Sequence, residues 1–289
     1  MLKVLGLGDN VCDKYLHSGY MYPGGQALNF AVYAKSLGIG ASYMGVLGTD
    51  ELAEHILWAL DQLGVEHSRC RRCEGENGYA VVNLVDGDRV FVTSNKGGVA
   101  KEHPIVLDHD DLRYLSGFDL IHTSNNSYFD LQLSVASELG VPISYDFSGQ
   151  WKDHKRATEI CKYISFGFLS CGSLPFEEVH AVCRRLHQQG CKIVVATCGS
   201  RGAILYDGIR FFAKPPELVT AVDTLGAGDS FATCFLVSFV QAERDNTERM
   251  RSDRGFFEES VEAALRSAAS FAAKTCLVNG AFGMGKQFE

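Results

Sequence analysis

The sequence predicts an α/β fold in which a mostly parallel, doubly wound sheet is flanked by helices and accompanied by a small separate β-sheet. β-rich apolar runs alternate with helical segments along most of the chain, which is the order that βαβ units require. Glycine follows the helical segments repeatedly, as expected where a chain leaves a helix in the left-handed conformation. One hairpin pattern interrupts the alternation and predicts strands outside the main sheet.

The main sheet is expected to contain short runs rich in Val, Ile, Tyr and Phe. In chain order these runs are residues 4–8, 41–46, 120–123, 143–147, 163–166, 193–197 and 203–206. Helices followed by glycine are expected between them, at residues 27–37, 51–63, 131–139 and 177–189. An apolar helix is expected around residues 231–240.

Two further β-rich runs, residues 79–85 and 89–93, are joined by Asp86-Gly87-Asp88. An Asp-Gly pair between β-runs is a strong hairpin signal, because both residues tolerate the positive φ of a tight turn. Residues 14–22 form another β-compatible segment outside the main alternation. An ordinary surface hairpin is the alternative to a functional element at this place.

Size and charge indicate an enzyme-like domain that acts on small molecules. The 289 residues show no internal repeat and no Pro- or Ser-rich linker, so one domain over residues 1–289 is expected. The 27 basic and 35 acidic residues give a net charge of −8, which disfavours a nucleic-acid partner, and no polybasic segment offers itself to a membrane. We expect a cytoplasmic location, because neither a secretion signal nor a bilayer-spanning run is apparent.

The ten cysteines are spread widely through the chain, and free thiols in a reducing compartment are expected. Cys70 and Cys73 form a CxxC pair, but no second pair lies at zinc-finger spacing to complete four ligands. A structural zinc ion is therefore not expected.

Residues 223–231, with the sequence Asp-Thr-Leu-Gly-Ala-Gly-Asp-Ser-Phe, precede an apolar helical run. Gly226, Ala227 and Gly228 carry little or no side chain, so their backbone N–H groups can surround an anion at the positive end of a helix dipole. Asp229 would then reach a substrate hydroxyl and could accept its proton as the hydroxyl attacks a phosphate. A glycine-rich turn with Asp229 as a helix N-cap is the alternative.

This motif and three others resemble the motifs of the ribokinase-like (PfkB) carbohydrate kinases, in that family's order. The other three are residues 8–13 (Gly-Asp-Asn-Val-Cys-Asp), 24–29 (Gly-Gly-Gln-Ala-Leu-Asn) and 197–202 (Thr-Cys-Gly-Ser-Arg-Gly). Within the family the chain is most similar to the fructoselysine 6-kinase branch, on residues 8–10, 145–151 and 279–281.

The resemblance implies a ribokinase-like fold and an ATP-dependent kinase with an alcohol group as acceptor. Residues of about 14–22 and 78–99 would form a β-sheet lid over the sugar. Asp229 would be the general base, and the predicted acceptor is O6 of fructoselysine or a related fructosamine. A kinase acting on fructose, ribose or a nucleoside is one alternative. A sugar-binding regulatory protein without catalysis is another.

The expected sugar site lies beyond the carboxyl ends of the strands, where open α/β sheets bind ligands. A polyhydroxyl ligand needs short, fixed donors and acceptors, and Gly24 and Gly25 would allow the backbone to approach it. Asn29 can donate and accept, although it could equally cap a helix. The remaining polar candidates directly follow the first strand and are Asp9, Asn10 and Asp13.

Four further residues are weaker candidates for the same ligand. Arg89 and Lys96, on or beside the expected lid, could meet the carboxylate of an amino-acid-bearing sugar. Solvated surface charges are the commoner explanation for such side chains. Asn125 and Asn126 follow the expected strand 120–123.

The nucleotide site is predicted at the loop after strand 193–197. Thr197, Gly199 and Gly202 would turn the chain against the phosphates and ribose of ATP. The resemblance also places three residues near the purine: Asn279, Gly280 and Ala281. Neither a GxxxxGK[ST] P-loop nor a complete GxGxxG motif is present, so those two modes of phosphate binding are excluded.

The resemblance implies Mg²⁺, but one family motif is missing. Many members carry Asn-x-x-Glu to help arrange Mg²⁺ and phosphate, and residues 168–173 have neither residue at that spacing. The nucleotide and water would then hold most of the Mg²⁺ coordination shell. Asp223 is a candidate for a monovalent-cation site, such as one for K⁺. Pairing of two lids is a candidate mode of homodimer formation.

Overall fold

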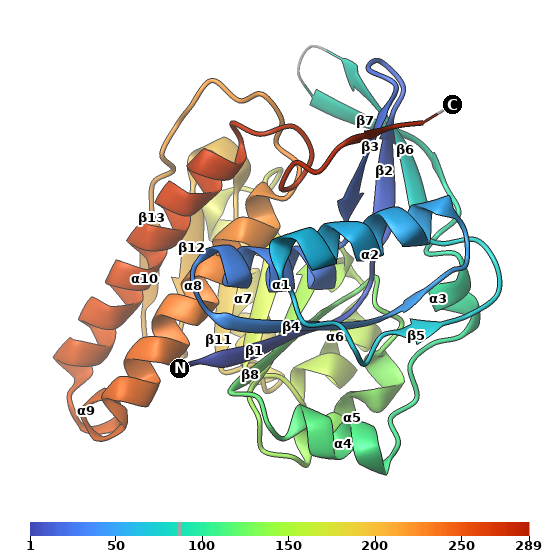
Figure 1. The fold of residues 1–289 in the computed structure, drawn as a ribbon. Coiled ribbons are helices and arrows are strands. Elements are labelled where there is room, and N and C mark those ends of the chain that lie inside the picture. The colour runs from blue at the N-terminus through green and yellow to red at the C-terminus, as the bar shows by residue number, and fades with distance from the viewer. Residues whose placement is uncertain (86–87, 289) are drawn as a thin grey trace.

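The molecule is built from two sheets, and the larger one is covered by helices on both faces (Figure 1). The computed structural model describes residues 1–85 and 88–288, with the backbone alone for residues 84, 85, 88, 89 and 91. Within these residues the larger sheet has the order β13-β12-β11-β10-β9-β8-β1-β4-β5, and the smaller has the order β14-β3-β2-β6-β7.

The strands of the larger sheet are β1 (Lys3–Gly8), β4 (Gly40–Leu47), β5 (Arg71–Arg72), β8 (Leu120–Ser124), β9 (Ile143–Ser148), β10 (Phe166–Ser170), β11 (Ile193–Thr197), β12 (Ala203–Tyr206) and β13 (Phe211–Lys214). The strands of the smaller sheet are β2 (Val11–Tyr15), β3 (Tyr20–Gly24), β6 (Tyr79–Val85), β7 (Asp88–Ser94) and β14 (Lys286–Gln287).

The helices are α1 (Gln26–Ser36), α2 (Glu51–Leu63), α3 (Val99–Glu102), α4 (His109–Leu115), α5 (Leu133–Ser137), α6 (His154–Cys161), α7 (Phe176–Gln188), α8 (Ala227–Asp245), α9 (Thr247–Ser252) and α10 (Arg254–Thr275).

The strand β1 lies where the winding of the larger sheet changes direction. It pairs in parallel with β4 on one side and with β8 on the other. Ligands of doubly wound sheets bind at such a switch point, in the crevice beyond the carboxyl ends of the two diverging strands. The residues after β1 and β8 therefore lie at the position where this fold class builds its sites.

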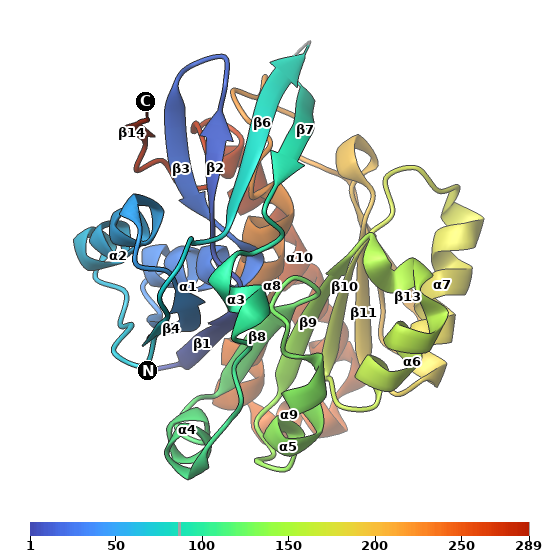
Figure 2. The same ribbon diagram turned by 90° about the vertical axis from the view of Figure 1, so that its right-hand side faces the viewer.

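Apolar cores on the two faces of the larger sheet hold most of the helices in place, and a third apolar core packs α2 against α1, β4 and the smaller sheet. Along β1, Val4 faces the core shared with α1, α8 and α10, whereas Leu5 and Leu7 face the core shared with α5, α6 and α7. This alternation follows from the two-residue period of a strand. Figures 1 and 2 show the two helical layers on opposite faces.

Most expected strands and helices are confirmed, with shifts of a few residues at their ends. The prediction of a strand at residues 163–166 was wrong, because the strand is β10 and Tyr163 and Ile164 lie in the turn before it. Ile164 is buried there, so its apolar character reflects core packing rather than strand pairing. Helix α10, the longest in the described chain, was not predicted from the sequence.

The predicted hairpin is confirmed, since β6 and β7 pair antiparallel. Its turn, Asp86-Gly87, lies outside the described residues. The β-compatible segment 14–22 contributes to the antiparallel pair β2 and β3, and β2 also pairs in parallel with β6. The sequence did not predict β14, which adds the C-terminal end of the chain to the edge of this sheet beside β3 (Figure 2). Among the described helices, none is long and apolar enough to cross a membrane.

Close packing of α1 on β1 gives a first prediction. A Cβ atom on Gly6 would lie 2.1 Å from the carbonyl oxygen of Ala27, so Gly6→Ala should force the helix away from the strand. We expect the free energy of unfolding, measured with urea, to fall by about 1–3 kcal/mol. Gly149→Ala is the control, because a Cβ there meets no atom within 4 Å. Equal stability of Gly6→Ala and wild type would contradict the packing.

Candidate active site

A cavity of about 630 Å³ lies between the smaller sheet and the carboxyl ends of the larger sheet's strands. A second cavity of about 400 Å³ lies beside the loop after β11 and helix α10. Thr224 and Gly228 line both cavities. The turn that leads into α8 therefore stands at the border between two adjoining spaces, each of a size that suits a small ligand.

Asp229 and Asn29 meet in the first cavity although 200 positions separate them in the sequence. Asp229 lies in the first turn of α8, and Asn29 lies in the first turn of α1. The side-chain amide of Asn29 donates a hydrogen bond of 2.6 Å to Oδ2 of Asp229. The Oδ1 atom of Asn29 is buried and has no hydrogen-bond partner among the described residues. It is thus an acceptor available to a ligand hydroxyl.

The turn before α8 has a backbone conformation and a close packing that favour glycine at position 226. Gly226 is left-handed at φ 74°, and a Cβ atom there would lie 2.2 Å from the hydroxyl oxygen of Tyr33. At Gly228 a Cβ atom would meet nothing within 4 Å. The first N–H groups of α8 have no acceptor within the helix, and its dipole places positive potential at this end.

Asp9 has a supporting position rather than an open one. Its carboxylate accepts hydrogen bonds from the backbone N–H groups of Gln26 (2.7 Å) and Ala27 (3.1 Å). It also accepts from the hydroxyls of Ser124 (2.8 Å) and Ser127 (3.0 Å). Although Asp9 borders the first cavity, these contacts use it to cap α1 and to join β1 to the end of β8.

Asn10 is similarly engaged within the protein. Its amide donates to the hydroxyl of Tyr43 (2.9 Å) and to the carbonyl of Val46 (2.8 Å), and its oxygen accepts from Asn77 (3.0 Å). Every polar group of this buried side chain thus has a partner within the protein. Asn10 also lines the first cavity, and its contact with the sugar stays a prediction.

Asp13 of β2, Gly24 of β3 and the next residue, Gly25, lie together at one end of the smaller sheet. Asp13 lies in β2 and lines the first cavity, as Gly25 does. A Cβ atom on Gly24 would lie 2.8 Å from Oδ2 of Asp13, and one on Gly25, at φ 114°, would lie 2.7 Å from Cα of Asn10. A larger residue at position 24 would displace the carboxylate of Asp13, and one at position 25 would displace the backbone of Asp9 and Asn10.

The sequence analysis did not single out Asp146, a buried carboxylate at the end of β9. Its Oδ1 accepts a 2.6 Å hydrogen bond from the backbone N–H of Ser148, and it is also hydrogen-bonded to the side chain of Gln26. Burial, the negative charge of Asp229 and, to a smaller extent, that of Asp9 raise the pKa of Asp146 to about 7. Its place near the carboxyl end of a strand, in the Tyr-Asp-Phe-Ser segment, was the available sequence signal.

Asp223 does not fit the expected monovalent-cation site. Its Oδ2 accepts from the hydroxyl of Tyr15 (2.6 Å) and from the backbone N–H of Gly280 (2.9 Å), and its Oδ1 accepts from the N–H of Leu225 (2.9 Å). Hydrogen-bond donors present positive charge to a carboxylate and compete with a cation for the same lone pairs. No group of three His, Cys, Asp or Glu in the described chain is arranged to hold a metal ion.

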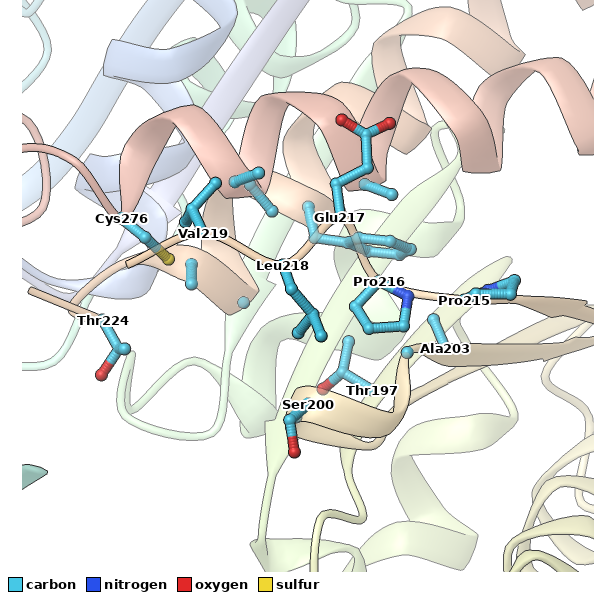
Figure 3. A pocket seen from close by; sticks show the side chains of 18 of the residues that line it. Thr197, Ser200, Ala203, Pro215, Pro216, Glu217, Leu218, Val219, Thr224 and Cys276 are labelled. Carbon is cyan, nitrogen blue, oxygen red and sulfur yellow. The ribbon is translucent and has the colours of Figure 1, made fainter. Parts of the chain in front are cut away.

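The second cavity has largely apolar walls, as Figure 3 shows from nearby. Thr197, Gly199 and Gly202 line it, as the sequence predicts. Leu218 and Pro216, from the segment after β13, face Thr197 across it (Figure 3). Helix α10 supplies the small side chains of Ala269, Ala272 and Ala273 on the remaining wall, and Cys276 follows directly after the helix.

The expectation that residues 279–281 lie near the purine stays a prediction. Asn279, Gly280 and Ala281 are not among the described residues that line the second cavity. Gly280 instead donates its N–H to Asp223, and the carbonyl of Ala281 accepts from Tyr33. These contacts lie behind the turn that leads into α8.

Two of the four weaker candidates for sugar binding line the first cavity. Lys96 and Asn126 line the first cavity, and the carbonyl of Lys96 accepts a hydrogen bond from the hydroxyl of Tyr128. The amide of Asn125 donates to Asn126. Arg89 lies in β7, but its side chain lies outside what the structure describes.

The chain is similar to carbohydrate kinases over nearly its whole length. A family model described as pfkB family carbohydrate kinase matches residues 3–284. The fructosamine kinase FrlD of Bacillus subtilis (strain 168) is 40% identical, with 100% of this chain and 95% of that protein covered. The fructoselysine 6-kinase of Escherichia coli (strain K12) is 30% identical, with 80% of this chain and 86% of that protein covered.

Solved structures confirm the ribokinase-like fold. The structure of Arabidopsis thaliana ribokinase complexed with ribose and ATP matches with a TM-score of 0.79 at 22% identity, covering 98% of this chain and 96% of that one. The ribokinase of Giardia lamblia matches with a TM-score of 0.82 at 16% identity, covering 98% and 96%.

The raised pKa of Asp146 predicts a pH dependence of stability. In the unfolded chain an Asp pKa is about 3.9, so between about pH 4 and about pH 7 the folded protein keeps a proton that the unfolded chain has lost. The contribution of Asp146 to stability is therefore lost as the pH rises through this range. Relative to Asp146→Asn, the wild-type free energy of unfolding should fall up to about pH 7 and then level off.

Urea unfolding of both proteins between about pH 5 and about pH 8 measures this difference. Asp110→Asn is the matched control, because Asp110 carries its carboxylate on the exposed surface of α4. A constant difference between wild type and Asp146→Asn across the range would contradict the assignment of the raised pKa to Asp146.

Proposed function

We propose that this chain, which belongs to the pfkB family of carbohydrate kinases, transfers the γ-phosphate of ATP to O6 of a fructosamine such as fructoselysine. Family membership makes it a phosphotransferase that acts on a sugar hydroxyl. The observation that carries the proposal is the position of Asp229 and the N-terminus of α8 at the border between the two cavities.

In the proposed mechanism Asp229 accepts the proton of the attacking hydroxyl. The oxygen of that hydroxyl forms a bond to the γ-phosphorus, the bond from this phosphorus to the β,γ-bridging oxygen breaks, and ADP leaves with the electron pair. The hydrogen bond from Asn29 orients the carboxylate of Asp229 toward the position of the attacking hydroxyl.

The turn of Gly226, Ala227 and Gly228 would stabilise the phosphoryl group during transfer. Backbone N–H groups at a helix N-terminus are fixed before the reaction, so they stabilise developing negative charge without reorganisation. Mg²⁺ carried by the nucleotide would neutralise further phosphate charge. Residues 168–173, where the family's Asn-x-x-Glu is missing, contribute no carboxylate.

The first cavity offers partners for both parts of a fructosamine, the sugar and the attached amino acid. Asp13 and the unpartnered Oδ1 of Asn29 provide acceptors for sugar hydroxyls near Asp229. Lys96 brings a positive charge to the same cavity, where it could pair with the carboxylate of an attached amino acid. Arg89 remains a candidate for this contact, and the smaller sheet would serve as the lid over the sugar.

The second cavity is proposed to hold the nucleotide. Its alanines and Leu218 form an apolar slot that suits the faces of a purine ring. Thr197, Gly199 and Gly202 would approach the ribose and phosphates, with Thr224 at the border to the sugar.

Location in the cytoplasm and formation of a homodimer through the smaller sheet both stay predictions.

Replacement of the general base tests the mechanism. Asp229→Asn should lower kcat by about 10²–10⁴, because the amide cannot take the proton. The measurement is coupled release of ADP from Mg-ATP with fructoselysine, related fructosamines, fructose, ribose and adenosine as acceptors. Asp245→Asn, at the exposed far end of the same helix, is the control. Near-full turnover by Asp229→Asn would end the assignment, and wild-type turnover confined to fructose, ribose or adenosine would favour the alternative kinase.

Filling the apolar slot tests the nucleotide site. Ala272→Leu should raise KM for ATP about tenfold, because the larger side chain occupies space next to the purine. KM for the sugar should change little. Ala263→Leu on the exposed face of α10 is the matched control. A raised KM for the sugar with an unchanged KM for ATP would reverse the assignment of the two cavities.

A further inference from the structure

The turn that leads into α8 is tied to the smaller sheet through a single buried carboxylate. Tyr15 is the last residue of β2, and its side chain is 2% exposed. Its hydroxyl donates to Asp223, which is 1% exposed and lies three residues before Gly226. A hydrogen bond to a charged, buried acceptor is among the stronger ones in a protein.

Asp223 also forms hydrogen bonds with the turn itself and with the end of α10. Its other carboxylate oxygen accepts from the N–H of Leu225, two residues further on. Its own N–H and that of Val222 both donate to the carbonyl of Cys276, at the end of α10. Asp223 therefore fixes the direction in which the chain enters Gly226 and the first N–H groups of α8.

The C-terminal segment supports the same turn from behind. Gly280 donates to Asp223, and the next residue, Ala281, packs so closely on Gly226 that a Cβ atom at Gly226 would lie 3.0 Å from the Ala281 Cβ. The chain then continues to β14, which pairs with β3 in the smaller sheet. Tyr22 of β3 packs on Gly280, where a Cβ atom would lie 2.6 Å from its ring.

We propose that Tyr15 is a positioning residue for phosphoryl transfer, which it controls by holding Asp223 and thereby the anion-binding turn of Gly226 to Gly228. The smaller sheet thus contributes to the reaction through the floor of the site as well as through its cover. The inference rests on the proposed transfer at the N-terminus of α8, but it is independent of which sugar is the acceptor.

The convergence of donors on Asp223 also explains why this residue does not suit K⁺. With Tyr15, Leu225 and Gly280 directed at its carboxylate, the protein itself supplies the positive partners that a cation would otherwise provide. The rate of the wild-type enzyme should accordingly be the same within about twofold when K⁺ is replaced by tetramethylammonium at equal ionic strength.

The test compares Tyr15→Phe with Tyr20→Phe. The first removes only the hydroxyl that bonds Asp223, and the second removes a hydroxyl from a partly exposed tyrosine of β3 in the same sheet. Tyr15→Phe should lower kcat about tenfold, with KM for the sugar changed by less than about threefold. Tyr20→Phe should match wild type in both quantities.

Hydrogen exchange of the backbone N–H groups of residues 223–230 provides a readout that needs no substrate. Tyr15→Phe should speed their exchange, while exchange in the main core strands stays as in wild type. Faster exchange in Tyr15→Phe, with a wild-type protein that phosphorylates none of the acceptors, would show that Tyr15 holds the turn but would overturn both its role in transfer and the proposed function. Unchanged exchange and unchanged kcat in Tyr15→Phe, or a wild-type rate that collapses without K⁺, would overturn the inference.

Discussion

The position of the whole site depends on the carboxylate of Asp9 at the switch point of the larger sheet. This side chain accepts hydrogen bonds from two backbone N–H groups of α1, from Ser124 at the end of β8 and from Ser127 after it. It thereby fixes one helix against two diverging strands. Asn29 lies in the first turn of that helix and donates to Asp229, so Asp9 helps to set the position of the Asp229 carboxylate through α1.

Local sequence patterns were sufficient to predict the parts of the fold that depend on the backbone preferences of neighbouring residues. The glycines after the helices, for example Gly64 in the left-handed conformation after α2, and the hairpin of β6 and β7 follow from backbone preferences. The strand β14 could not be predicted, because two paired residues carry no periodic pattern. Helix α10 was missed since its alanine-rich wall alternates with charged residues, and only tertiary packing on α8 shows which face is buried.

The site was predictable where a motif demands a particular backbone and less so where side chains compete for partners. Gly226, Gly228 and Asp229 are placed as the motif predicts, since only a turn into a helix accommodates them. Asp9 and Asn10 were expected among the ligand contacts, but their hydrogen bonds are made within the protein. Asp146 escaped notice because its raised pKa arises first from burial and then from the charges of Asp229 and Asp9, which lie far away in the sequence. Only the folded arrangement reveals such neighbours.

The shared border of the two cavities has a consequence for inhibitor chemistry. Because Thr224 and Gly228 belong to both spaces, one molecule could join a sugar-like head to a purine tail through a short phosphate bridge and occupy the two at once. The second half of such a compound would bind at the high effective concentration that a short linker creates. A bisubstrate compound of this kind would bind more selectively than a general purine mimic, because its sugar-like head would contact the acidic residues of the first cavity.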